Sequence, residues 1–123
     1  MDDLPVYRLR RDRYRRARGG NTRLIDIYCA PCNELLLVYQ KDMPRGKLKR
    51  CYIDRIFYPE RFSSLHNDPK VRGKDDLPPM SCGKCGALVG VPMLYAKHGE
   101  HRLAYGMLDG RFVKRNSTHA AAK

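Results

Sequence analysis

The chain has 123 residues, a length that suits one compact domain. It contains 25 Lys and Arg against 13 Asp and Glu, and the resulting net charge of +12 favours a polyanionic partner over an acidic small substrate. No run of about 18 apolar residues exists, which excludes a transmembrane helix. The first residues, 1–5, lack the pattern of a signal peptide, so we expect a cytoplasmic protein with reduced cysteines and no membrane partner.

The first 23 residues are expected to form a basic arm. They contain eight arginines and three aspartates, and seven of the arginines fall within eleven residues. Asp3 and Pro5 suit the start of a helix, but a free helix of this length is marginal in water and the arginines repel one another. We therefore expect an arm that orders only against a partner or the domain body. Its candidate nucleic-acid-binding residues are Arg8, Arg10, Arg11, Arg13, Arg15, Arg16 and Arg18.

Residues 24–115 predict a mainly β domain. Alternating and continuous apolar runs with β-branched and aromatic residues indicate strands at 24–28, 35–39, 48–58 and within 82–95. The stretches 101–108 and 111–114, joined by Asp109-Gly110, predict a hairpin. Residues 59–80, rich in proline and turn residues, are expected to form an internal surface loop, and residues 116–123 a flexible tail.

Two Cys-x-x-Cys pairs, separated by 49 residues, are the most specific motif of the chain; they comprise Cys29, Cys32, Cys82 and Cys85. A two-residue spacer lets one tight turn present both sulfurs to a single ion, and zinc takes four thiolates in a tetrahedron at about 2.3 Å. The pattern predicts one structural Zn²⁺, which leaves no open position for a catalytic water. Lys84 lies within the second pair and is suited to offset part of the thiolate charge. Iron bound by the same four cysteines is an alternative.

The two cysteine pairs belong to an internal repeat. An offset of 53 places Cys29 on Cys82, and it also aligns Leu35 with Leu88 and Val38 with Val91. Asn33 falls on Gly86, and these are the two residue types that best tolerate a left-handed backbone. The sequence therefore predicts two units, each a zinc knuckle with a β-hairpin, that share one zinc.

The fifth cysteine, Cys51, shares a strand face with Ile53 and Phe57, which predicts a small buried residue. Its basic neighbours Lys49 and Arg50 favour a thiolate, so a thiol-dependent reductase is a second, weaker interpretation. In zinc-containing methionine sulfoxide reductases, however, the catalytic cysteine follows the second Cys-x-x-Cys pair, whereas Cys51 lies between the pairs.

Basic residues outside the arm predict a nucleic-acid-binding face on the hairpins, formed by Lys47, Lys49, Arg50, Lys114 and Arg115. The hypothesis is a small non-enzymatic module that binds nucleic acid, RNA in preference to DNA, or a ribonucleoprotein surface, with the arm contacting phosphates. The alternative is an adaptor that holds a peptide of a protein partner. Binding that weakens with salt would favour nucleic acid over the adaptor.

The second knuckle, Cys82-Gly83-Lys84-Cys85 with Gly90 after it, resembles the Cys-x-x-Cys-x-x-x-x-Gly signature of the β-tent superfamily. That superfamily includes the Yippee-like proteins and the thalidomide-binding domain of cereblon. The resemblance implies two antiparallel sheets joined at an apex by one zinc. Because the chain has no tryptophan, the imide-binding cage of the cereblon domain is not implied. The segment from Leu48 to Ile56 also resembles small bacterial zinc-ribbon proteins, which imply no function.

Overall fold

The computed structural model describes residues 6–43 and 46–122, which fold into two four-stranded antiparallel sheets and a short parallel pair of strands. The mainly β prediction is confirmed. The first sheet has the order β5-β3-β2-β9 and comprises β2 (Arg23–Cys29), β3 (Leu35–Lys41), β5 (Ile56–Tyr58) and β9 (Phe112–Asn116). The second has the order β4-β8-β7-β6 and comprises β4 (Arg50–Tyr52), β6 (Met80–Ser81), β7 (Leu88–Tyr95) and β8 (Arg102–Met107).

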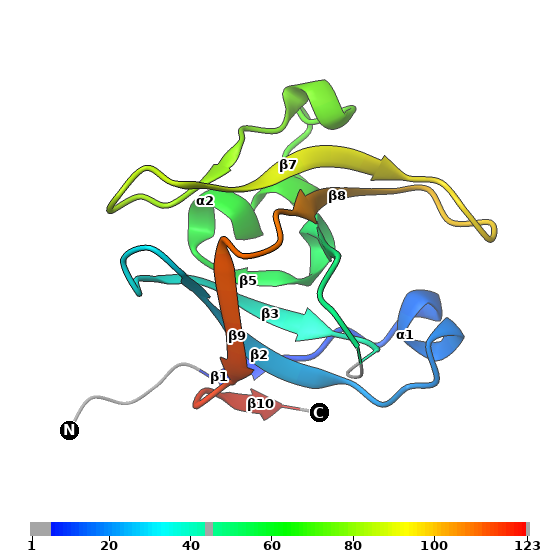
Figure 1. The fold of residues 1–123 in the computed structure, drawn as a ribbon. Coiled ribbons are helices and arrows are strands. Elements are labelled where there is room, and N and C mark those ends of the chain that lie inside the picture. Colours follow the sequence, from blue (N-terminus) through cyan, green and yellow to red (C-terminus); the bar gives the residue numbers. More distant parts are fainter. Residues whose placement is uncertain (1–5, 44–45, 123) are drawn as a thin grey trace.

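The main hydrophobic core lies between the two sheets, which Figure 1 shows one above the other. Ile27 of β2 and Leu37 of β3 are paired across the first sheet and are both fully buried. Val89 and Tyr105 contribute buried side chains from the second sheet. Because side chains alternate along a strand, each sheet directs one apolar set into this core.

The segment 48–58, predicted as one strand, is divided between the sheets. β4 belongs to the second sheet and β5 to the first, and the 3-10 turn η1 (Ile53–Arg55) connects them. The prediction was wrong because the turn buries Arg55 completely among carboxylates, a set of charge contacts that a hydropathy pattern does not contain.

The hairpin predicted over 101–114 is also wrong. β8 pairs with β7 and β4, whereas β9 crosses to the first sheet and pairs antiparallel with β2. In that register Phe112 lies opposite Cys29 and Lys114 opposite Ile27. Both edges of β8 are paired, with β4 and β7, so β9 pairs with the remaining edge of β2 and the turn at Asp109-Gly110 connects the two sheets.

The internal segment 59–80 is more ordered than the predicted loop. It contains three short helices and packs Phe62, Leu65 and Leu77 into the main core. The Tyr105 hydroxyl donates a hydrogen bond of 2.6 Å to the Pro78 carbonyl, which ties the end of the segment to β8. The helices are α2 (Glu60–Ser63), η2 (Leu65–Asn67) and η3 (Lys74–Asp76).

The described part of the basic arm is ordered against the domain body. It forms β1 (Val6–Arg8) and the helix α1 (Arg13–Ala17), whose N-cap is Asp12. The backbone N–H of Arg10 donates to Oε1 of Gln40 at 2.7 Å. The helix start expected near Asp3 and Pro5 lies outside the described residues.

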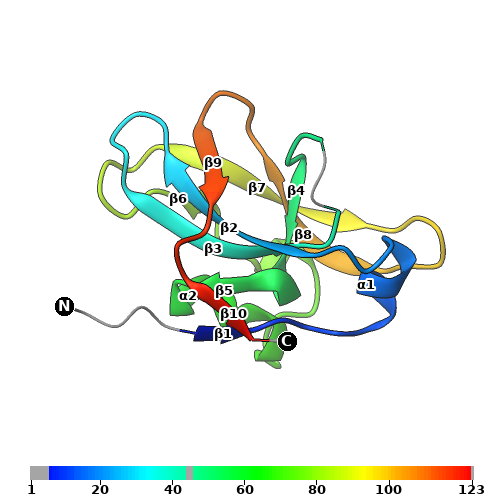
Figure 2. The same cartoon turned by 90° about the horizontal axis from the view of Figure 1, so that it is seen from below.

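The described part of the C-terminal segment 116–123, expected to be a flexible tail, contributes two strand segments. Asn116 ends β9, and β10 (Ala120–Ala122) pairs in parallel with β1. Figure 2 shows β1 and β10 side by side. This backbone pairing depends on a partner strand near the other end of the chain, so no local sequence pattern predicts it.

Among the described residues, the helices are all too short to span a membrane.

Candidate metal centre and basic surface

Each Cys-x-x-Cys pair lies in the turn of an antiparallel hairpin, β2–β3 or β6–β7. The two turns share the same backbone hydrogen bonds. Cys29 N–H donates to Glu34 O at 2.8 Å, and Cys82 N–H donates to Ala87 O at 2.9 Å. The offset of 53 relates the two donors to each other and the two acceptors to each other. Asn33 and Gly86 have φ values of 63° and 78°, which confirms the predicted left-handed positions.

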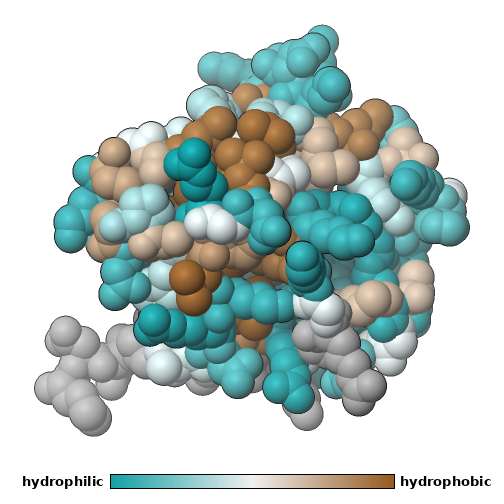
Figure 3. Space-filling model, in the orientation of Figure 1, coloured by the Kyte–Doolittle hydropathy of each residue, from teal (hydrophilic) through white to brown (hydrophobic). Residues whose placement is uncertain are grey.

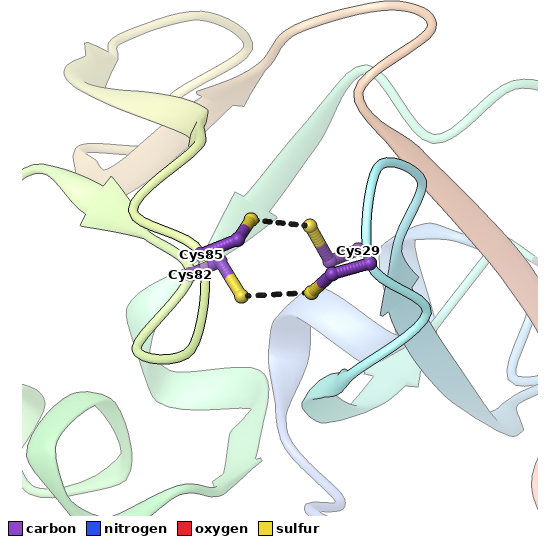
Figure 4. A group of neighbouring side chains, drawn as sticks. Cys29, Cys82 and Cys85 are labelled. Carbon is purple, nitrogen blue, oxygen red and sulfur yellow. Dashed lines mark hydrogen bonds between the residues drawn. The ribbon is translucent and has the colours of Figure 1, made fainter.

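The fold brings the four cysteine sulfurs of these turns together, although the pairs are far apart in sequence. All four sulfurs lie within 4.8 Å of one another. Cys29 Sγ is 3.6 Å from Cys85 Sγ, and Cys32 Sγ is 3.5 Å from Cys82 Sγ (Figure 4). Four sulfurs in a tetrahedron around zinc are separated by about 3.8 Å, whereas a disulfide requires about 2.05 Å. The cysteines are free thiols in an arrangement that can hold one metal ion.

The four thiols differ in exposure and in electrostatic surroundings. Cys29 and Cys82 are buried, Cys32 is half-buried and Cys85 is exposed. Burial raises the pKa of the Cys29 thiol to about 12. Burial also acts to raise the pKa of Cys82, but backbone N–H groups of Cys85 and Lys84 donate to its sulfur and bring the pKa down to about 7. The second turn thus stabilises a thiolate before any ion binds.

Arg61 is a residue near the site that the sequence did not indicate. Its Nη2 donates to the carbonyl of Ser81 at 3.2 Å. The same atom would lie 3.5 Å from a Cβ built on Gly83, so its positive charge lies beside the second cysteine turn. Arg61 belongs to the segment expected to be a loop, and nothing in its local sequence distinguishes it from a solvated arginine.

Three of the predicted basic residues surround one surface cavity of about 540 Å³, which we call the lysine cavity. Its lining consists of Gly46, Lys47, Leu48, Lys49, Met107, Asp109, Phe112 and Lys114. The Lys114 ammonium donates to the carbonyl of Gly46 at 2.6 Å, which joins β9 to the segment before β4. On the face that carries β9, Figure 3 shows hydrophilic side chains bordering hydrophobic ones.

A second cavity of about 800 Å³ shares the 46–49 segment with the lysine cavity. Arg50 lines it and places its guanidinium 4.5 Å from the centre of the Tyr95 ring. Arg18, from the end of the basic arm, also lines it but forms an ion pair with Glu100 at 2.8 Å. Basic side chains from the arm, from the 46–50 segment and from β9 therefore line two cavities that share residues 46–49.

The other predicted basic residues are more dispersed. Arg115 lies on the opposite face of β9 from Lys114, and its guanidinium is 5.1 Å from the centre of the Tyr28 ring. Within the arm, Arg10 bonds His66 and Arg15 bonds Thr22. Arg10 therefore binds the domain body, whereas the bond from Arg15 to Thr22 stays within the arm. Of the candidate binding arginines in the arm, Arg8, Arg11, Arg13 and Arg16 are exposed.

Cys51 is fully buried in the main core, and burial raises the pKa of its thiol. This agrees with the prediction of a small buried residue. A reductase that used Cys51 would need an accessible thiolate, and this environment provides neither access nor a thiolate.

In comparisons with known proteins, no protein family, no curated protein and no solved structure matched the chain.

Proposed function

We propose that this protein is a zinc-stabilised β module that binds single-stranded nucleic acid, RNA in preference to DNA. The observation that carries the proposal is the convergence of Lys47, Lys49 and Lys114 on the lysine cavity, with Arg50 beside them at the second cavity. We call these four residues the basic strip. Its two segments, residues 47–50 and Lys114 of β9, are separated by more than 60 positions in the sequence.

The zinc ion has a structural role in this proposal. The close approach of four sulfurs from two hairpins of different sheets supports a shared tetrahedral site. The common hydrogen bonds of the two turns support the repeat of two knuckle-and-hairpin units, in the manner of a β-tent. With zinc bound by four thiolates the ion holds the two sheets together at one end, and it supplies no reactive position.

The strip suits a single strand better than a duplex. Of the described helices, α1 has five residues and α2 has four, too short to read a major groove. Lysine and arginine side chains around a partly apolar cavity can follow a flexible backbone and contact unstacked bases. The exposed arginines of the arm add phosphate contacts that do not depend on sequence. A single-stranded segment of a ribonucleoprotein offers the same chemistry.

Fluorescence anisotropy with a labelled single-stranded RNA, measured over a range of salt concentrations, tests the proposal. The test variant combines Lys47→Gln, Lys49→Gln and Lys114→Gln. The matched control combines Lys70→Gln, Arg72→Gln and Lys74→Gln, which removes the same charge from the distant segment 68–76. We expect the test variant to reduce the slope of log affinity against log salt by about 2, and the control to leave it nearly unchanged.

Two results would contradict the proposal. Equal losses in both variants would show that total charge, and not the basic strip, determines binding. Absence of RNA binding together with salt-insensitive capture of a peptide would favour the adaptor.

A further inference from the structure

We infer that the lysine cavity takes one unpaired base of the bound strand while its lysines hold the neighbouring phosphates. This inference rests on the proposed function and adds the subsite that would make binding depend on bases as well as on charge.

The wall of the cavity is apolar and is fixed by the core. Leu48 is buried, and Met107 and Phe112 are half-buried and pack against the main core. Phe112 lies opposite Cys29 in the β2–β9 ladder, so the cysteine turn holds the strand that presents it. A volume of about 540 Å³ falls in the range of small-ligand sites and exceeds what one side chain would fill.

The rim of the cavity is cationic. Lys47 and Lys49 are exposed, and Lys114 uses one of its three N–H donors on Gly46, which leaves two for a phosphate. Among the described residues that line the cavity, Asp109 is the only acidic one. Its carboxylate lies 3.9 Å from the Lys47 ammonium, and both side chains are well exposed. Such an exposed ion pair is weak, so a phosphate can compete with the carboxylate for Lys47.

An apolar wall beneath a cationic rim fits a flat ring that carries anionic groups at its edge. A nucleotide within a flexible single strand has this chemistry, and contact of its base with an aromatic side chain is tolerant of sequence. A base within a duplex is stacked and paired, so it enters only at the cost of leaving the stack. The cavity therefore favours unpaired over paired nucleic acid.

The test compares two single-stranded oligonucleotides of about ten nucleotides, identical in phosphate number, one of which has stable abasic residues throughout. The variant Phe112→Leu keeps an apolar core contact but removes the ring. Val113→Ala, on the opposite face of β9, is the matched control. Zinc content and amide dispersion in NMR spectra confirm that both variants fold.

We expect the wild-type protein and Val113→Ala to bind the normal oligonucleotide about tenfold more tightly than the abasic one. In Phe112→Leu this ratio falls towards one, while affinity for the abasic strand is unchanged. Equal affinity of the wild type for both strands would overturn the base subsite and leave the proposed function intact. A ratio unaffected by Phe112→Leu would place any base contact elsewhere and overturn the assignment. Failure to bind either strand would overturn both proposals.

Discussion

Replacing Asp12 with alanine tests whether the arginine-rich arm is part of the folded domain. Asp12 has two functions in the structure. Its carboxylate caps α1 by accepting from the N–H groups of Tyr14 and Arg15. It also bonds the guanidinium of Arg55, at 2.6 Å and 3.1 Å, and Arg55 is completely buried.

The expected loss follows from these contacts. Removal of an N-cap costs about 1 kcal/mol. Hydrogen bonds to a charged partner contribute about 1.5 to 3 kcal/mol, and the lower part of that range applies because the Asp12 side chain is 38% exposed. Arg55 keeps its bonds to Asp42 and Asp54, so it is not left alone in the core. We therefore expect Asp12→Ala to reduce the free energy of unfolding by about 2 to 3 kcal/mol, which a domain stable by ~5–15 kcal/mol survives.

Urea unfolding in the presence of zinc and a reducing agent measures this difference. Asp75→Ala is the matched control, since Asp75 is exposed and also carries a carboxylate in the first turn of a short helix. We expect the control to change stability by less than about 0.5 kcal/mol. If Asp12→Ala were equally neutral, the ionic contacts between arm and body would not stabilise the protein, and the ordered arm would be refuted.

Three further predictions concern pH, affinity and thiol chemistry. Burial acts to raise the pKa of Asp12, but hydrogen bonds, first from Arg55, lower it to about 2. The stabilisation that the Asp12 carboxylate provides is therefore present above pH about 4 and lost towards pH 2. The difference in free energy of unfolding between wild type and Asp12→Ala should shrink over that range. Asp109→Asn removes a negative charge beside Lys47 and should tighten RNA binding about two- to fivefold at low salt, measured by anisotropy. A weaker affinity would contradict the binding of RNA at the lysine cavity. Cys51 should react with a thiol reagent only after unfolding; rapid labelling of the native protein, located by mass spectrometry, would contradict its burial.

The cluster of four cysteines was predictable because its determinants are local. A Cys-x-x-Cys spacing, a residue that tolerates a left-handed backbone and a following apolar run occur within each turn. The fold needs only to bring two such turns together, which places four sulfurs where one metal ion could be held. Even so, the position of Arg61 beside the second cysteine turn depends on where the 59–80 segment packs. The composition of that segment predicts only a loop.

The assignment of strands to sheets was not predictable from local patterns. The segment 48–58 has strand composition throughout, and only the burial of Arg55 among Asp12, Asp42 and Asp54 explains the turn that separates β4 from β5. Asp109-Gly110 is a good hairpin turn, yet β9 gains its ladder from β2. These outcomes depend on contacts between residues far apart in the sequence.

The basic surface was predictable in part. The structure places Lys47, Lys49 and Lys114, three of the basic residues named from the sequence, around one cavity, and their binding of nucleic acid stays a prediction. Lys114 and Arg115 are adjacent in the sequence but point to opposite faces of a strand, so they do not act together. Arg18 forms an ion pair with Glu100 of the domain body. The arginine-rich composition of the arm does not indicate which of its arginines form such contacts.

Native mass spectrometry of the purified protein weighs the bound metal and so decides whether the four clustered cysteines hold one ion. We expect one zinc per chain in the wild type and in Cys51→Ala, which keeps the four clustered thiols, and loss of the metal together with the native amide dispersion in Cys85→Ser. A wild-type mass without a metal, or a Cys85→Ser variant that keeps its native spectrum without one, would contradict the account.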